Sequence, residues 1–296
     1  MSNLQGNSQK HIPVMAAEVL ELLNLKKDGT YIDGTIGAGG HTFEILSNLS
    51  SRGKVIGMDR DTDALELSFQ KLKSFKKQIN LHHASYHNIP NIMKKNDISG
   101  VDGILLDLGL SSMQLDSDDR GFSFQRNGRI DMRFDHTRGE SANELINRLN
   151  QDELANIIYE FGEERRSRGI AKSIKKNNTI QTTSDLVNAI RKSTPPHHRN
   201  KTLARVFQAI RIAVNGEIEK LKSFLDIFLQ YLNKEGRLVI MSYHSIEDRI
   251  VKNFFRELKK GNKALVLTKK PLTPSTSEIK LNRRSRSAKV RALEKI

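Results

Sequence analysis

Short apolar runs alternate with amphipathic stretches along the first third of the chain. Residues 29–35, 53–59 and 101–109 are apolar runs, and each holds an acid at or near its end. Between them, residues 41–49 and 63–75 repeat apolar side chains every three or four positions, as amphipathic helices do. Continuous apolar strands that alternate with helices predict an α/β fold with a parallel sheet covered on both faces.

The pattern changes after the third run. Residues 116–140 are polar, contain glycine and both charges, and are too long for an ordinary connection inside a sheet. Capping sequences follow at 141–144 and 150–153, and residues 182–196 predict a helix that two prolines stop. We expect residues 116–200 to form an inserted helical subdomain, which we interpret as the part that recognises the substrate.

The sheet pattern then resumes. Residues 203–232 carry one long apolar face that Gly216 is expected to bend, and residues 236–245 read as the next buried strand. A helix is predicted at 246–258, with the last strands at 264–270 and 288–296. The 296 residues are therefore predicted to form one Rossmann-like domain, 1–115 with 201–296, interrupted by the insert.

Composition narrows the class of protein. The first twelve residues hold no apolar signal-peptide core, and no apolar run approaches the roughly 20 residues that span a bilayer. The chain has no cysteine, which excludes disulfides, thiolate metal sites and a cysteine nucleophile. We expect a cytoplasmic protein that makes no contact with a membrane.

The charge is strongly positive, with 49 Lys and Arg against 34 Asp and Glu, or +15. Residues 259–296 hold twelve Lys or Arg against Glu278 and Glu294, a net charge of +10. Such an excess attracts polyanions, so we interpret this segment as an RNA contact rather than a solvated tail.

Candidate chemistry lies at the ends of the predicted strands. Residues 33–41 read DGTIGAGGH, and the spacing of Gly37, Gly39 and Gly40 is not the Gly-x-Gly-x-x-Gly of a dinucleotide fold. Backbone without Cβ lets a ligand approach closely, and a helix that opens at His41 would point its amides at that ligand.

Three acids, Asp33, Asp59 and Asp107, are predicted to meet at one edge of the sheet. Asp59 follows the glycines by about 20 residues, where an acid binds a ribose. Asp61 is better placed to cap the helix that follows, so we favour the ligand role for Asp59. Asp107 begins a turn with hydroxyls and an amide, and a simple strand-end cap remains an equal alternative for it.

Two other site classes are disfavoured. A nicotinamide-dependent oxidoreductase needs the phosphate fingerprint that this chain lacks. His82, His83 and His87 lie close together, but adjacent histidines in a strand point to opposite faces and no zinc-hydrolase pattern occurs, so we predict no metal.

Ten ordered motifs carry a resemblance that runs from His11 to Ile296. They are HIPVMAAEVL, YIDGTIGAGGH, MDRD, GILLDLGLSSMQLD, RGFSF, RIDMRFD, FGEERRSRGIA, ARVFQAIRIAVNGEIEKL, SYHSIEDRIVKNFF and NRRSRSAKVR. Together they resemble the bacterial 16S ribosomal RNA cytosine-N4 methyltransferase family (RsmH, formerly MraW). The resemblance implies a class I S-adenosylmethionine-dependent enzyme with a helical insert, acting on a decoding-centre cytidine of the small ribosomal subunit.

The resemblance also implies roles for single residues. Gly39, Gly40 and His41 would line the methionine side, Asp59 would bind the ribose, Tyr86 would flank the adenine, and Asp107 and Gln114 would close the pocket. With the strand-end acid and first glycine added, the expected S-adenosylmethionine site comprises Asp33, Gly37, Gly39, Gly40, His41, Asp59, Tyr86, Asp107 and Gln114. Two positions depart from the family, where Phe often replaces Tyr86 and Pro usually stands at Met113.

The expected chemistry needs an acceptor for protons of the target amine. We expect Asp107 and the backbone of residues 108–111 to serve, with Ser111 and His244 as further candidates. A non-catalytic, RNA-binding ribosome-assembly factor is the main alternative, because it would share the basic surface. Whether the protein forms a homodimer is left open.

Overall fold

The computed structural model describes residues 13–176 and 179–296. The predicted absence of a signal peptide concerns the first twelve residues, which lie outside this part. The chain divides into two compact units. The first unit combines Met1–Gly109 with Leu221–Ile296, and the second is Leu110–Lys220.

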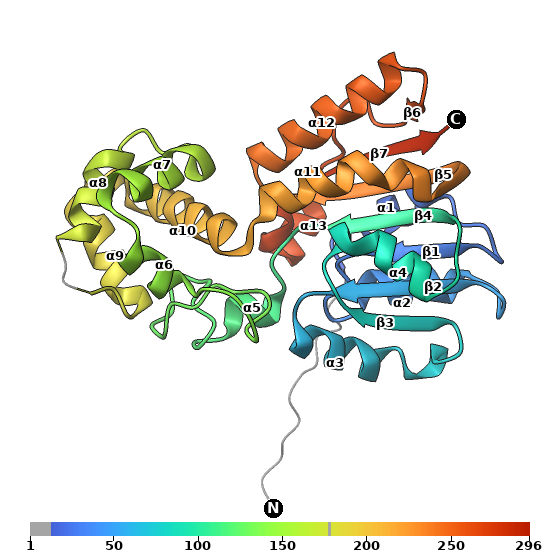
Figure 1. Cartoon of the computed structure of the whole chain (residues 1–296), viewed down its shortest axis with the longest axis horizontal. Helices are drawn as coiled ribbons and strands as arrows, with labels where there is room; N and C mark the ends of the chain where they lie inside the picture. The colour runs from blue at the N-terminus through green and yellow to red at the C-terminus, as the bar shows by residue number, and fades with distance from the viewer. Residues whose placement is uncertain (1–12, 177–178) are drawn as a thin grey trace, which may run out of the picture. The chain divides into compact units, whose positions relative to one another are not determined.

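The first unit is built on a seven-stranded sheet with the order β3-β2-β1-β4-β5-β7-β6 (Figure 1). Its strands are β1 (Thr30–Asp33), β2 (Lys54–Asp59), β3 (Ile79–His83), β4 (Val101–Asp107), β5 (Leu232–Ser242), β6 (Ala264–Val266) and β7 (Lys289–Lys295). The first five strands pair in parallel, and β7 is antiparallel to both β5 and β6. The predicted α/β class, with a largely parallel Rossmann-like sheet, is confirmed.

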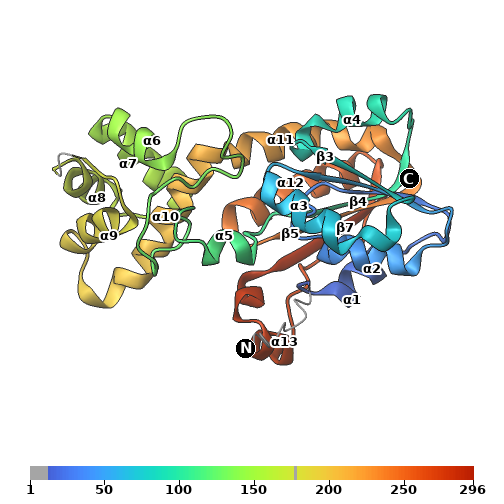
Figure 2. The same cartoon turned by 90° about the horizontal axis from the view of Figure 1, so that it is seen from below.

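Helices cover both faces of this sheet (Figures 1 and 2). One face packs against α1 (Ala16–Leu23), α2 (Gly40–Asn48) and the segment after α3 (Thr62–Lys71). The other packs against α4 (Ile89–Lys95), α11 (Glu217–Ile227) and α12 (Ser245–Lys260).

Neighbouring strand residues point to opposite faces, which explains the continuous apolar runs. In β1, Tyr31 belongs to the core cluster under α1 and α2, whereas Ile32 belongs to the cluster under α4 and α11. In β4, Leu105 and Leu106 divide between the two clusters in the same way. Both faces of each central strand are therefore buried.

The second unit is helical. Its helices are α5 (Ser112–Asp116), α6 (Ala142–Arg148), α7 (Gln151–Gly162), α8 (Ser167–Lys175), α9 (Thr183–Lys192) and α10 (Arg199–Asn215). They enclose a core of their own that also takes in Phe122, Ile130 and Met132 from the long polar segment. Asn215 fixes that segment, because its side chain accepts from Phe134 N at 2.8 Å and donates to Met132 O at 2.7 Å.

The second unit, 110–220, is longer than the expected insert of 116–200. The reason is the apolar face of α10, where Leu203, Val206 and Ile210 join the helical core and not the sheet. Gly216 then ends α10 in a left-handed conformation, with φ at 57°. The apolar face of 203–232 is therefore split between two helices, so Gly216 ends a helix where a bend was expected.

Two predicted strand ranges are wrong in detail. The range 236–245 was set too late, because β5 runs from Leu232 to Ser242 and His244 already caps α12. The range 264–270 is mostly irregular, since β6 stops at Val266. The predicted caps at Ser141 and Asn150 are confirmed, because both form reciprocal capping boxes with the glutamate three residues on.

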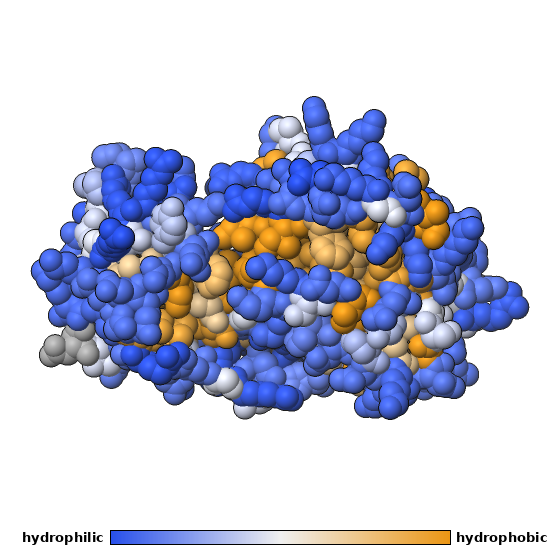
Figure 3. Space-filling model, turned by 45° about the horizontal axis from the view of Figure 1, so that its top comes forward, coloured by the Kyte–Doolittle hydropathy of each residue, from blue (hydrophilic) through white to orange (hydrophobic). Residues whose placement is uncertain are grey.

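No described helix has the length and apolar composition needed to cross a bilayer. Hydrophilic side chains cover most of the face drawn in Figure 3.

Candidate functional site

The three strand-end acids lie at one edge of the sheet, as predicted. β2, β1 and β4 are adjacent and parallel, and Asp33 stands in register with Gly57 and Leu105. Asp59 and Asp107 therefore lie two residues further along the neighbouring strands. Their carboxylates are close enough to Asp33 for both to raise its pKa.

Asp33 is buried, with 1% of its surface exposed. Its Oδ1 accepts from Thr35 N at 3.2 Å, and its Oδ2 accepts from the Thr42 hydroxyl at 2.7 Å. Burial raises the pKa of Asp33 to about 7, the two hydrogen bonds oppose this, and the charges of Asp107 and Asp59 add to it. Asp33 therefore ties the start of the glycine loop to α2.

The glycine loop, residues 34–40, needs glycine for its backbone. Gly37 and Gly39 have φ of 52° and 77°, in the left-handed region that side chains disfavour. A Cβ built at Gly37 would meet only Thr35 O, at 4.0 Å, so the space beside it is open. The N-cap of α2 is Gly39, which has no side chain to cap the first amides of the helix. Open space and uncapped amides fit a close-lying ligand.

Asp59 holds the other side of this loop. Its Oδ2 accepts from Gly37 N at 2.8 Å and its Oδ1 from Asp61 N at 2.9 Å. Burial raises the pKa of Asp59, although these hydrogen bonds oppose the rise. Asp61 caps α3 by accepting from Asp63 N at 3.1 Å, so the prediction that Asp59 is not that cap is confirmed.

Asp107 is more accessible, with 24% of its side chain exposed. Its Oδ1 accepts from Gly109 N at 3.1 Å, and its Oδ2 lies 3.7 Å from Nε2 of the buried His41. Its backbone N donates to the Thr35 hydroxyl at 2.6 Å, which fixes the carboxyl end of β4 to the glycine loop. Asp107 is thus a strand-end carboxylate that solvent reaches.

Tyr243 is a neighbour of Asp107 that the sequence interpretation missed. A Cβ on Gly109 would lie 2.5 Å from Tyr243 Cε2 and 3.1 Å from Asp107 Oδ1, so ring and carboxylate flank the same glycine. Burial raises the pKa of Tyr243 well above its usual range, and the charge of Asp107 and a hydrogen bond to it add to the rise. The phenol is therefore a neutral hydrogen-bond donor beside the carboxylate. The Tyr243 hydroxyl also lies 3.0 Å from Met241 Sδ, but a carboxylate is the stronger acceptor of the two.

Tyr86, expected beside an adenine, is largely a core residue. It begins a short 3-10 helix after β3 and is 8% exposed. Its ring packs edge to face on Phe224, with centroids 5.6 Å apart. Its Cβ lies 2.9 Å from a Cβ built at Gly34, so Tyr86 reaches the glycine loop from the sheet side.

The remaining site candidates serve as helix caps. His244 caps α12, accepting from Glu247 N at Nδ1 (3.4 Å), and its Nε2 lies 3.1 Å from the buried Glu247 carboxylate. Ser111 and Gln114 belong to the second unit, where they form the reciprocal capping box of α5 at 3.1 Å in both directions. The first unit brings the other candidates together.

Thr35 and Thr42 were also missed, although both lie inside the motif that drew attention to the loop. The Thr42 hydroxyl donates to Asp33, and the Thr35 hydroxyl accepts from Asp107 N, contacts that only the fold creates. The three neighbouring histidines have separate partners. His82 Nε2 lies 3.1 Å from Asn96 Nδ2, His83 Nε2 3.0 Å from Arg60 O, and His87 Nδ1 2.9 Å from Ser85 Oγ.

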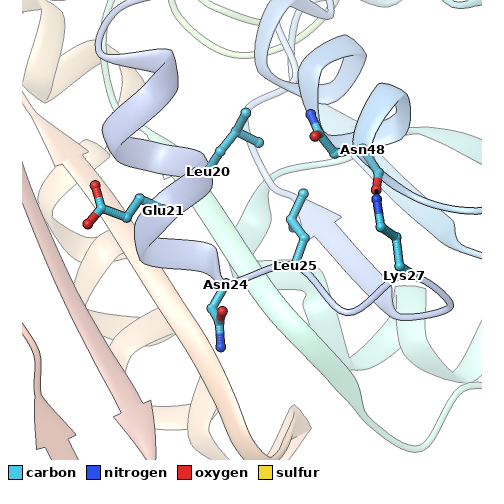
Figure 4. A pocket seen from close by; sticks show the side chains of 6 residues that line it. All are labelled: Leu20, Glu21, Asn24, Leu25, Lys27 and Asn48. Carbon is cyan, nitrogen blue, oxygen red and sulfur yellow. Dashed lines mark hydrogen bonds between the residues drawn. The ribbon is translucent and has the colours of Figure 1, made fainter.

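A separate shallow pocket lies at the opposite edge of the sheet (Figure 4). It is lined by the C-terminal ends of α1 and α2 and the segment before β1, namely Leu20, Glu21, Asn24, Leu25, Lys27 and Asn48. It contains none of the strand-end acids. In parallel sheets ligands bind beyond the carboxyl ends of strands, so the edge with Asp33, Asp59 and Asp107 is the candidate site.

Comparison with known proteins points the same way. The model of the MraW methylase family matches residues 8–296. A Clostridium botulinum (strain Kyoto) protein named ribosomal RNA small subunit methyltransferase H is 42% identical over 307 residues, covering 97% of this chain and 99% of its own. A Kosmotoga olearia protein of the same name is 43% identical over 294 residues, with 98% of both chains covered.

Proposed function

Because the chain belongs to the MraW methylase family of S-adenosylmethionine-dependent methyltransferases, we propose that it methylates N4 of a decoding-centre cytidine in 16S ribosomal RNA. The names of the relatives support ribosomal RNA of the small subunit as the substrate. The charge of +15 supports a polyanionic partner. The accessible carboxylate of Asp107, which can accept protons from an amine, supports an exocyclic amine as the target.

The residues at the carboxyl edge fit the methyl donor. We assign the open side of Gly37 and the first amides of α2 to the cofactor, and the Asp59 carboxylate to its ribose hydroxyls. Asp33 acts indirectly, since both of its oxygens hold the loop. Tyr86 is mostly buried, so only the exposed part of the residue could contact an adenine. When bound, S-adenosylmethionine supplies an electrophilic methyl group.

Asp107 carries the proposal. Cytosine N4 is a poor nucleophile because its lone pair is delocalised into the ring, so the enzyme must orient the amine and accept its protons. Asp107 offers an accessible carboxylate whose Oδ1 is fixed by Gly109 N. Orientation supplies on the order of 7 to 11 kcal/mol in well-aligned reactions, and a positioned base adds roughly 10²- to 10⁴-fold.

The other two catalytic candidates are less well suited. The Ser111 hydroxyl accepts from Gln114 N, and His244 Nδ1 accepts from Glu247 N. Either would have to give up a helix cap to accept a proton from the substrate. We therefore assign proton acceptance to Asp107 and the backbone after it, and substrate recognition to the second unit.

The test is methyl transfer from labelled S-adenosylmethionine to naked small-subunit RNA, isolated small subunits and whole ribosomes. Nucleoside analysis of the product should give N4-methylcytidine with at least one of these substrates. A methyl group on carbon 5 or on the ribose would contradict the assignment of the amine. Binding of the cofactor without transfer to any of the three would favour an assembly factor.

A further inference from the structure

Residues 273–288 form a basic arm on the first unit. The arm contains α13 (Thr276–Leu281) and a short 3-10 helix (Arg283–Ser287). It leads directly into β7, whose first residue, Lys289, is in register with Ser242 at the end of β5. The arm therefore leaves the sheet at the carboxyl edge, and Figure 2 shows α13 standing out from it.

The register also sets how far the arm starts from Asp107. Asp107 pairs with Met241, and Met241 pairs with Val290. Two strand spacings separate the outer residues, so Val290 lies about 10 Å from Asp107. Leu272 closes the base of the arm through backbone hydrogen bonds to Val290 of 3.0 and 2.9 Å.

Contacts with the first unit hold the arm in place. Glu278 Oε1 accepts from Met15 N at 2.7 Å, and Pro13, two residues earlier, lies 3.3 Å from a Cβ built at Gly40. The arm is thus linked to the glycine loop through three residues of chain.

The turn that follows α13 in the arm is also fixed. The Ser285 side chain is fully buried and donates to Asn282 O at 2.7 Å. Asn282 Oδ1 accepts from Arg284 N at 3.1 Å. The residues on either side of Asn282 therefore have a defined position.

Those residues make an unusual surface. Leu281 is 87% exposed, more than any other large apolar side chain in the described part of the chain. Lys280, Arg283 and Arg286 around it are exposed as well. Cations of this kind hold phosphates, and proteins that kink nucleic acid insert an apolar side chain between bases.

The last three cations of the chain differ from these. Lys289 and Arg291 both contact Asp248, at 3.3 and 2.7 Å, and Arg291 is 6% exposed. Lys295 donates to Leu232 O at 2.6 Å. These three side chains stabilise the sheet, whereas the cations of the arm are exposed and lie beside an exposed apolar side chain.

We propose that the basic arm grips RNA beside the target nucleotide and that Leu281 enters the base stack as the target base leaves it. The proposal rests on the proposed function, since a base must leave its stack for its amine to reach Asp107. The exposed cations hold the flanking phosphates. Leu281 then fills the gap and so prevents the base from returning.

The experiment compares two RNA substrates with one target cytidine. In the first, the cytidine is stacked inside a hairpin of small-subunit sequence, and in the second it lies in a short unstructured oligonucleotide. Leu281→Ala should slow single-turnover transfer to the hairpin by about tenfold or more, the cost of unstacking without a wedge, and transfer to the oligonucleotide by less than about threefold. Leu281→Met, which keeps a long apolar side chain, should methylate the hairpin at about the wild-type rate.

Leu265→Ala is the matched control, since Leu265 is 50% exposed on β6 and pairs with Glu294, six residues beyond the end of the arm. It should leave both rates unchanged. A fluorescent 2-aminopurine next to the target should brighten when the wild type binds the hairpin, and brighten less with Leu281→Ala. Equal losses on both RNAs, or no loss on the hairpin, would overturn the wedge. A wild type that methylates neither RNA nor ribosomal particles would refute the proposed function instead.

Discussion

Replacing Asp33 with asparagine should make the folded protein more stable at neutral pH. The pKa of Asp33 is about 7 in the folded protein, against an ordinary value of 3.8. At 1.36 kcal/mol per pKa unit, the difference corresponds to an upper limit of about 4 kcal/mol. Asparagine keeps an acceptor for Thr35 N and removes the charge that lies near Asp59 and Asp107.

The sign follows from proton binding. Between pH 3.8 and about 7 the folded protein keeps the Asp33 proton and the unfolded chain loses it, so wild-type stability falls as the pH rises. Above pH 7 the full cost is present. The advantage of Asp33→Asn over the wild type should therefore grow by roughly 2 to 3 kcal/mol between pH 5 and pH 8.

Urea unfolding followed by circular dichroism at both pH values measures this difference. Asp97→Asn, the same change at an exposed position of the first unit, is the control and should show no such growth. An advantage that is equal at both pH values, or larger at pH 5, would refute the reasoning. It would mean that Asp33 keeps its charge when buried.

Three further predictions concern the proposed site. Asp59→Ala should weaken S-adenosylmethionine binding by about 1.5 to 3 kcal/mol in calorimetry, the range for hydrogen bonds to a charged group, and unchanged affinity in a folded variant would remove Asp59 from the site. Asp107→Asn should lower the single-turnover rate by about 10²-fold or more while cofactor affinity changes less than about tenfold; a large loss of affinity with a normal rate at saturation would make it a binding residue. Reversing the charges of Arg284 and Arg286 should weaken RNA binding and reduce its log-log salt slope by roughly 0.7 to 0.9 per lost contact, and an unchanged slope would mean that these arginines are merely solvated.

Local sequence predicted much of the fold because its main determinants are local. Apolar runs gave the central strands, and hydroxyl, amide and acid side chains gave the caps at Asp61, Ser141 and Asn150. The limits of the insert were missed because the apolar face of α10 could pack equally well against the sheet or against the other helices. Only its packing against α7 and α6 decides which core it joins.

The site divides in the same way. The acids and glycines were found because strand ends and left-handed turns leave a pattern in sequence. Tyr243 was missed because it meets Gly109 from 134 residues away, through the pairing of β4 with β5. His244 was a further candidate acceptor from its residue type, and the structure adds that its position before α12 makes it a helix cap.

The insertion of the second unit has a consequence for the order of folding. β4 and β5 are neighbours in the sheet. Along the sequence, however, the 111 residues of the second unit lie between the part of the first unit that contains β4 and the part that contains β5. Closing an unstructured loop of that length is slow compared with local pairing, because many non-local conformations must be searched. The helical unit holds its own core, so it can fold first and shorten the effective loop. We therefore expect β1 to β4 and the helical unit to form during synthesis, and the edge that carries Asp107 to be completed last, when β5 and β7 arrive.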